Sequence, residues 1–243
     1  VAVIAIPIAL QNLLTTTGSM VDTMMIAPLG ELSVGAVGLC AQFSSLMFSG
    51  YWGFMGGGML FFAQYYGAKD DGGVNRAYGM TLLCMMADAV VFSALALFFP
   101  EFVMRVYTDK PAIQEIGVKY LRIVGISYLF IAVTQVYLNI MRSIERVVIA
   151  TFVYLMSLIV NAVINAILIF GLLGFPALGI QGAAIGTLCA RMTETLIVLI
   201  YAHFMNQDVK IRPRFMIQID RVLAKDYLIY AMPVVFSARC SCP

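Results

Sequence analysis

The 243-residue sequence predicts an all-α integral membrane protein. Its residues are 62% hydrophobic and only 12% charged, with a mean hydropathy of +0.93, whereas about a quarter of the residues in a soluble domain are charged. Three long stretches contain no Asp, Glu, Lys or Arg: 32–68, 123–141 and 147–190. A helix needs about 20 apolar residues to cross a membrane, so these stretches have room for several crossings. They lack the period-two alternation of a membrane β-barrel.

The first three helices are expected at 1–27, 34–66 and 77–99. The first ends at Pro28-Leu29-Gly30, because proline and glycine break helices. The second is apolar throughout, and we expect its glycines between 53 and 58 to interrupt it. A polar loop at 69–73 follows, and the third helix stops at Pro100.

The next three helices are expected at 113–141, 147–170 and 179–206. The stretch from Arg105 to Pro111 is expected to be a loop, and 142–146 a short charged turn. The breaker-rich segment 171–176 separates the fifth helix from the sixth. A long basic loop follows the sixth helix, and 227–236 begins a seventh.

Loop charges predict the orientation of these helices. The segments after the second, fourth and sixth helices carry nine Lys and Arg residues, and those after the other three carry three. Cytoplasmic loops are enriched in Lys and Arg, so the first set and the N-terminus are expected in the cytoplasm. The net charge is only +2, so nothing indicates binding to nucleic acid.

Asp22 interrupts an otherwise apolar helix. A carboxylate inside a membrane costs a few kcal/mol or more and usually serves ions, protons or substrate. Asn161 and Asn165 are four residues apart and share a helix face. With a rise of about 1.5 Å per residue, these two, Asp22 and Thr187 all lie at a similar depth in the outer half of the membrane. These oxygens suit Na⁺ or a proton on Asp22. The alternative is that the amides only join helices together.

Other polar residues are weaker candidates. Four that could line a cavity are Asp88, Tyr128, Gln135 and Asn139. For Asp88, a packing role is equally compatible with the pattern. Arg191 and Glu194 are three apart and are expected to form an ion pair. Small residues such as Gly182 and Gly186 permit close contact between helices.

Four motifs span nearly the whole chain: Pro7…Gln11-Asn12…Val21-Asp22-Thr23…Leu29-Gly30, Ala63-Gln64-Tyr65-Tyr66-Gly67-Ala68, Asn161-x₃-Asn165-x₂-Leu168-Ile169-Phe170-Gly171 and Gly179-x₂-Gly182-Ala183-Ala184-x₂-Thr187. Taken together they resemble the multidrug and toxin extrusion (MATE) family of cation-coupled exporters. The resemblance implies twelve helices in two six-helix lobes. Residues 1–206 would be the N-terminal lobe, 207–226 a cytoplasmic inter-lobe loop, and 227–243 a truncated start of the second lobe.

The resemblance also implies a cation site at Asp22, Asn161, Asn165 and Thr187. Some members of the family carry Asp at the position of Asn165. The amide keeps an oxygen ligand but removes a charge, which weakens a Na⁺ site. Asp22 could then act alone through protonation.

The implied function is antiport, with amphipathic, often cationic organic compounds exported in exchange for Na⁺ or H⁺. No cofactor beyond the coupling ion is expected. The expected partners are the organic substrates, the lipid bilayer and the second lobe of the same protein, in a bacterial inner membrane. The alternative is a flippase of related fold for lipid-linked oligosaccharides or polysaccharides, which should have a strongly basic cavity, whereas the membrane interior offers chiefly Arg191. An enzyme is not expected, because the chain has a single His and no convergent set of catalytic residues.

Overall fold

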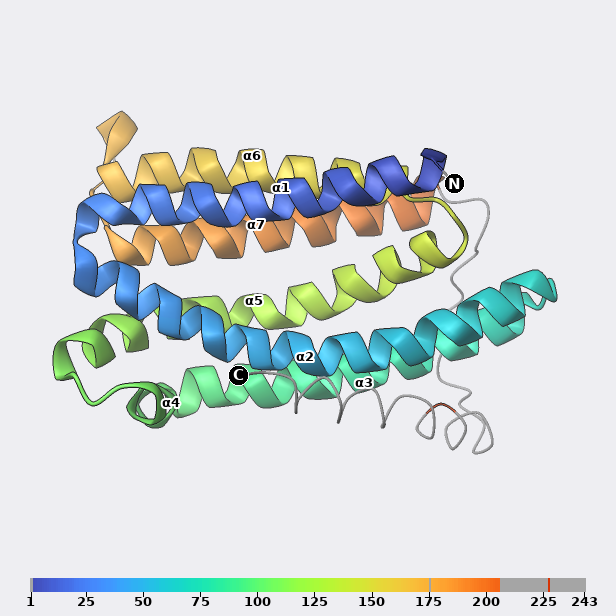
Figure 1. The fold of residues 1–243 in the computed structure, drawn as a ribbon, viewed down its shortest axis with the longest axis horizontal. Coiled ribbons are helices and arrows are strands. Elements are labelled where there is room, and N and C mark those ends of the chain that lie inside the picture. Colours follow the sequence, from blue (N-terminus) through green and yellow to red (C-terminus); the bar gives the residue numbers. More distant parts are fainter. Residues whose placement is uncertain (1, 175, 206–226, 228–243) are drawn as a thin grey trace.

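The computed structural model describes residues 2–174, 176–205 and Tyr227, and the described elements are all helical (Figure 1). The α-helices are α1 (Ala2–Ile26), α2 (Glu31–Gly67), α3 (Asp71–Phe98), α4 (Pro100–Tyr107), α5 (Pro111–Ser143), α6 (Val148–Phe170) and α7 (Ile180–Ile200). Short 3₁₀ turns cover Ala27–Leu29 and Leu172–Gly174, and a π-helical turn, Tyr201–Met205, extends α7. Apart from Tyr227, the expected inter-lobe loop and seventh helix lie outside the described residues.

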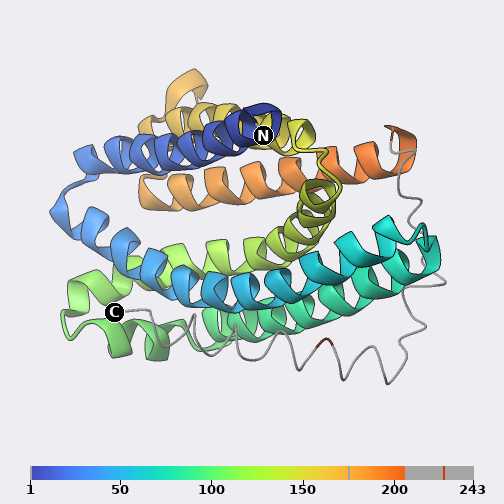
Figure 2. The same cartoon turned by 45° about the vertical axis from the view of Figure 1, so that its right-hand side comes forward.

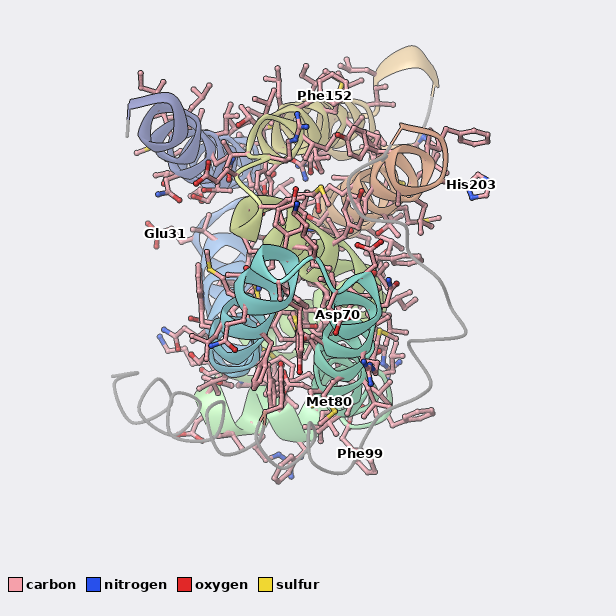
Figure 3. All side chains as sticks on the ribbon, turned by 90° about the vertical axis from the view of Figure 1, so that its right-hand side faces the viewer. Glu31, Asp70, Met80, Phe99, Phe152 and His203 are labelled. Atoms are coloured by element: carbon pink, nitrogen blue, oxygen red, sulfur yellow. The ribbon has the colours of Figure 1, made fainter. Side chains whose placement is uncertain are left out.

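The helices form two layers with α5 between them. Helices α1, α6 and α7 lie on one side, and α2 and α3 on the other (Figures 1 and 2). Five described helices, α2, α3, α5, α6 and α7 with its extension, are long and apolar enough to cross a membrane. Among them α5 is the most buried. The others expose large apolar side chains such as Phe152, which Figure 3 shows on the outside of the bundle, as expected for a surface facing lipid.

Helix α2 is continuous, so the expected interruption at its glycines is wrong. Gly57 and Gly58 are buried, and a Cβ on Gly58 would lie 2.7 Å from Thr81 Oγ1 of α3. The missing side chains therefore bring the two helices into close contact. In a membrane this packing outweighs the weak helix propensity of glycine.

Two boundaries near the helix ends also differ from expectation. Helix α3 begins inside the expected polar loop, because the Asp70 side chain accepts a hydrogen bond from Gly73 N at 3.0 Å and caps the helix. The expected loop from Arg105 is wrong in its first part, because α4 extends to Tyr107. Helix α4 starts with a proline and has Arg105 in its last turn, two features that favour a helix.

The turns at the end of the bundle near Asp22 are where the sequence predicts them. Gly30 has φ +97° and Gly171 has φ +70°, conformations that side chains with a Cβ rarely adopt. These residues reverse the chain between α1 and α2 and end α6. They thereby fix the positions of α1 and α6, the two helices that carry Asp22 and the asparagines.

We expect Gly182→Ala to destabilise the protein by about 1–3 kcal/mol, the usual cost of overpacking. A Cβ there would lie 2.7 Å from the backbone carbonyl of Leu168, which cannot yield as a side chain can. The control is Gly38→Ala on α2, which meets nothing within 4 Å and gains up to about 1 kcal/mol of helix propensity. Thermal unfolding of the purified full-length protein would compare them, and equal midpoints would contradict the expected close contact of α6 with α7.

Candidate functional site

The Asp22 carboxylate joins α1 to α6. Asp22 lies about one turn before the end of α1 and is half-buried. Asn165 Nδ2 donates one hydrogen bond to Asp22 Oδ1 at 2.7 Å and another to Asn161 Oδ1 at 3.0 Å. Both asparagines are buried and lie on one face of α6, as their spacing predicts.

Thr187 borders the same cleft as Asp22 and Asn161. The cleft has a volume of about 160 Å³ and lies between α1, α6 and α7. The Thr187 hydroxyl donates to the carbonyl of Ala183 at 3.1 Å, which leaves its oxygen lone pairs free to accept a further bond. The structure thus places the four predicted residues together, and their role as cation ligands stays a prediction.

Two further groups act on Asp22. Arg191 Nη1 donates to Glu194 Oε1 at 2.7 Å, which confirms the predicted ion pair, and the Arg191 charge also interacts with Asp22. Tyr120 of α5 lies close enough to Thr187 and Asp22 to interact with both. Sequence reasoning missed Tyr120, because nothing in its local pattern separates it from a packing aromatic.

Gly186 of α7 makes the position of Asn165 possible. A Cβ on Gly186 would collide with Asn165 Oδ1. That oxygen is buried and has no hydrogen-bond partner within the described part of the chain. The amide therefore turns both N–H bonds toward Asp22 and Asn161 and its oxygen toward the bare backbone of α7.

A second, larger cavity of about 500 Å³ lies between α1, α2 and α5. Of the residues predicted to line a cavity, Gln135 and Asn139 border this one. Tyr128 is buried instead, with its hydroxyl 2.8 Å from Ser44 Oγ. Asp88 is half-buried on α3 and borders neither cavity; its charge acts on Tyr51.

Arg142 also borders this cavity, although the sequence places it in a charged turn. It lies in the last turn of α5, and its Nη2 donates to Gln11 Oε1 at 3.1 Å and to the Tyr154 hydroxyl at 3.2 Å. The only sequence signal was its position at the end of an apolar helix, from which a long side chain can turn inward as easily as toward water.

Comparison with known proteins identifies related sequences. Residues 7–167 match the family model MatE. The chain is 25% identical over 197 residues to "Probable multidrug resistance protein YoeA" of Bacillus subtilis, covering 81% of this chain and 42% of the relative. It is 27% identical over 180 residues to "Probable multidrug resistance protein NorM" of Rhizobium meliloti, covering 74% and 38%. The chain thus spans less than half the length of these relatives.

Solved structures share the fold. An outward-facing multidrug resistance MATE family transporter of the MOP superfamily superposes with a TM-score of 0.86 at 23% identity, covering 98% of this chain and 52% of that one. An inward-facing form gives a TM-score of 0.81 at 23% identity, covering 93% and 51%. The described helices are therefore those of one lobe, which confirms the predicted fold class. Because the MatE match covers most of its length, this chain belongs to the MATE family of membrane transporters, which are not enzymes.

Proposed function

We propose that the full-length protein is a secondary antiporter that exports amphipathic organic compounds in exchange for a cation taken up at Asp22. The observation that carries this proposal is the Asp22 carboxylate, held at 2.7 Å by an amide of another helix beside a polar cleft. A carboxylate within a membrane bundle is costly, and such residues usually mark a path for ions or substrate. The relatives are named as probable multidrug resistance proteins, which agrees with export of organic compounds.

The local chemistry favours a proton over Na⁺ as the coupling ion. Asp22 is the one carboxylate among the four predicted ligands, and Asn165 offers it an N–H group rather than an oxygen. Na⁺ binding at Asp22, Asn161, Asn165 and Thr187 would require the Asn165 amide to turn its oxygen around. The Arg191 guanidinium opposes both cations at Asp22, so the choice between them rests on the ligand set.

Protonation would change the interactions that hold α1. A neutral Asp22 weakens its attraction for Arg191 and its charge-assisted bond from Asn165. Helix α1 could then shift relative to α6 and α7. Exchange follows if the two arrangements differ in proton affinity and open to opposite sides.

The expected orientation places the Asp22 end of the bundle outside and the turns at 67–71 and 143–148 in the cytoplasm. The relatives named above are bacterial, which agrees with a location in the bacterial cytoplasmic (inner) membrane. Na⁺ or H⁺ would be the only ion required, and the second lobe of the same protein would complete the path.

A flippase of related fold remains the alternative within transport. The second cavity contains Arg142 as well as Arg191, so it is more basic than the sequence indicates. Two guanidinium groups, one of them paired with Glu194, still fall short of the strongly basic cavity expected for lipid-linked diphosphates. Transfer of a labelled lipid-linked oligosaccharide across vesicles, without export of aromatic compounds, would favour the flippase.

Reconstituted vesicles would test the antiporter. We expect a pH gradient to drive accumulation of an aromatic dye by the full-length protein, and a Na⁺ gradient at constant pH to drive none. Accumulation with Na⁺ alone would overturn the proton assignment. No response to either gradient, for dyes of either charge, would overturn the antiporter itself.

We expect Asn165→Asp to make transport respond to Na⁺. The substitution adds a second carboxylate beside Asp22 and replaces the N–H donor with an oxygen ligand, both of which favour a hard cation. Asn165→Ser, which also removes the amide but adds no charge, is the matched control. Dye transport measured at fixed pH with and without Na⁺ would show stimulation in the Asp variant only; equal responses would contradict the ligand assignment.

A further inference from the structure

The larger cavity adjoins the Asp22 cleft and extends from it along α1 toward Gln11 and Asn12. From their turn at 27–30, α1 runs beside α6 while α2 diverges toward α3 (Figure 1). The cavity of about 500 Å³ opens between them. Its apolar wall comes mainly from α2, with Phe48, Tyr51, Trp52, Met55 and Met59. Trp52 is 64% exposed, so this wall presents an aromatic surface.

The polar wall carries positive charge. Arg142 and Arg191 border the cavity, and its lining, within the described chain, contains no carboxylate. Arg191 is paired with the buried Glu194. Arg142 forms no ion pair with any described carboxylate, and its partners, Gln11 and Tyr154, are both neutral.

The Arg142 guanidinium is held in place by acceptors from two other helices, α1 and α6, which are fixed by further hydrogen bonds. Gln11 of α1, which accepts from Arg142, is itself fixed by donating to the Val147 carbonyl at 3.1 Å and to Thr151 Oγ1 at 3.2 Å. The Tyr154 hydroxyl of α6 is held by Gln135 of α5 at 3.2 Å. These contacts orient the guanidinium without neutralising it. Nη2 gives its two N–H groups to these partners, so Nε and Nη1 are the groups that donate charge-assisted hydrogen bonds to an anion.

We propose that this cavity binds the anionic group of an aromatic carboxylate, with Arg142 as the residue that recognises the charge. The aromatic part of the ligand packs against Trp52 and its apolar neighbours on α2, where ring contacts add to the buried apolar area. This proposal names the charge of the exported compound and so rests on the export function proposed above. It differs from the expectation that the substrates are mostly cationic.

The residue proposed to bind the anion is distinct from Asp22, although the two cavities adjoin and share Thr15, Tyr154 and Arg191 in their lining. Gln11, which contacts Arg142, precedes Asp22 by 11 residues on α1, or about 16 Å of helix. The anion and the coupling ion therefore do not compete for one group. Their exchange depends on which conformation of the whole protein binds each of them.

Three naphthalene compounds of similar size would test the charge preference: 2-naphthoate, 2-naphthamide and 2-naphthyltrimethylammonium. Binding is measured by equilibrium dialysis with the full-length protein in nanodiscs of neutral lipid. We expect 2-naphthoate to bind about tenfold or more tightly than 2-naphthamide, the usual scale of one charge-assisted hydrogen bond. Tighter binding of the ammonium compound than of 2-naphthoate by the wild-type protein would overturn the proposal.

Variants assign the preference to one residue. Arg142→Gln should abolish the preference for 2-naphthoate while 2-naphthamide still binds, and Arg142→Lys should retain part of it. Arg122→Gln, on the same helix but outside the cavity, should leave it unchanged. A preference that survives in Arg142→Gln would exclude Arg142 as the recognising residue.

Transport of the same compounds separates this proposal from the export function. Proton-driven transport of the ammonium compound, without binding or transport of 2-naphthoate, would retain the export function and overturn the anion site. Tight, Arg142-dependent binding of 2-naphthoate without proton-driven transport of any of the three would retain the site and overturn the export function.

Discussion

Asp22→Asn is expected to abolish export while leaving the protein in the membrane. The substitution changes one atom, and an amide oxygen at this position can still accept the bond from Asn165 Nδ2 that the carboxylate accepts at 2.7 Å. The amide cannot take up or release a proton, and it carries no charge for Arg191 to attract. Drug resistance and dye efflux should fall to background in cells that lack other pumps, at an unchanged amount of protein in the membrane.

Asp109→Asn is the matched control, because Asp109 is exposed between α4 and α5. It should export normally, which would show that removing a carboxylate elsewhere has no general effect. Wild-type drug resistance in the Asp22→Asn protein would count decisively against coupling through this residue, whatever its packing.

Helical spacing and the expected depth in the membrane were enough to predict that the candidate residues lie together. Asn161 and Asn165 share a face because they are four apart, and equal depth brought Asp22 and Thr187 to them from other helices. These inferences succeed in a membrane bundle because helices are long, roughly parallel and regular in rise. The turns at Gly30 and Gly171 were predictable for a similar reason, since local backbone geometry determines them.

Features that depend on a neighbouring helix could not be predicted. The glycines of α2 indicated a break in the helix, but the helix is continuous and Gly58 is a contact point with α3. The charge of Arg142 indicated a cytoplasmic turn, yet Gln11 of α1 and Tyr154 of α6 supply acceptors that direct it inward. In both cases the local sequence is compatible with two structures, and the helix packed against it determines which one forms.

Gly186→Ala is expected to reduce export strongly although it removes no polar group. The added Cβ would collide with Asn165 Oδ1, and a helix backbone cannot retreat as a side chain can. The Asn165 amide would have to move, and its bond to Asp22 would lengthen or break. Losing a hydrogen bond to a charged group costs about 1.5–3 kcal/mol, so proton-coupled transport should fall roughly tenfold to a hundredfold.

The comparison with Gly182→Ala separates the site from general packing. Both glycines lie on α7 and contact α6, but Gly182 meets the backbone of Leu168 and Gly186 meets the Asn165 side chain. Both variants should unfold at lower temperature, and only Gly186→Ala should shift the pH at which transport is half-maximal, because only it disturbs the partner of Asp22. The pH of half-maximal transport could instead be the same in the Gly186→Ala and wild-type proteins. Asn165 would then not control the proton affinity of Asp22, and coupling would depend on other neighbours of the carboxylate, such as Arg191.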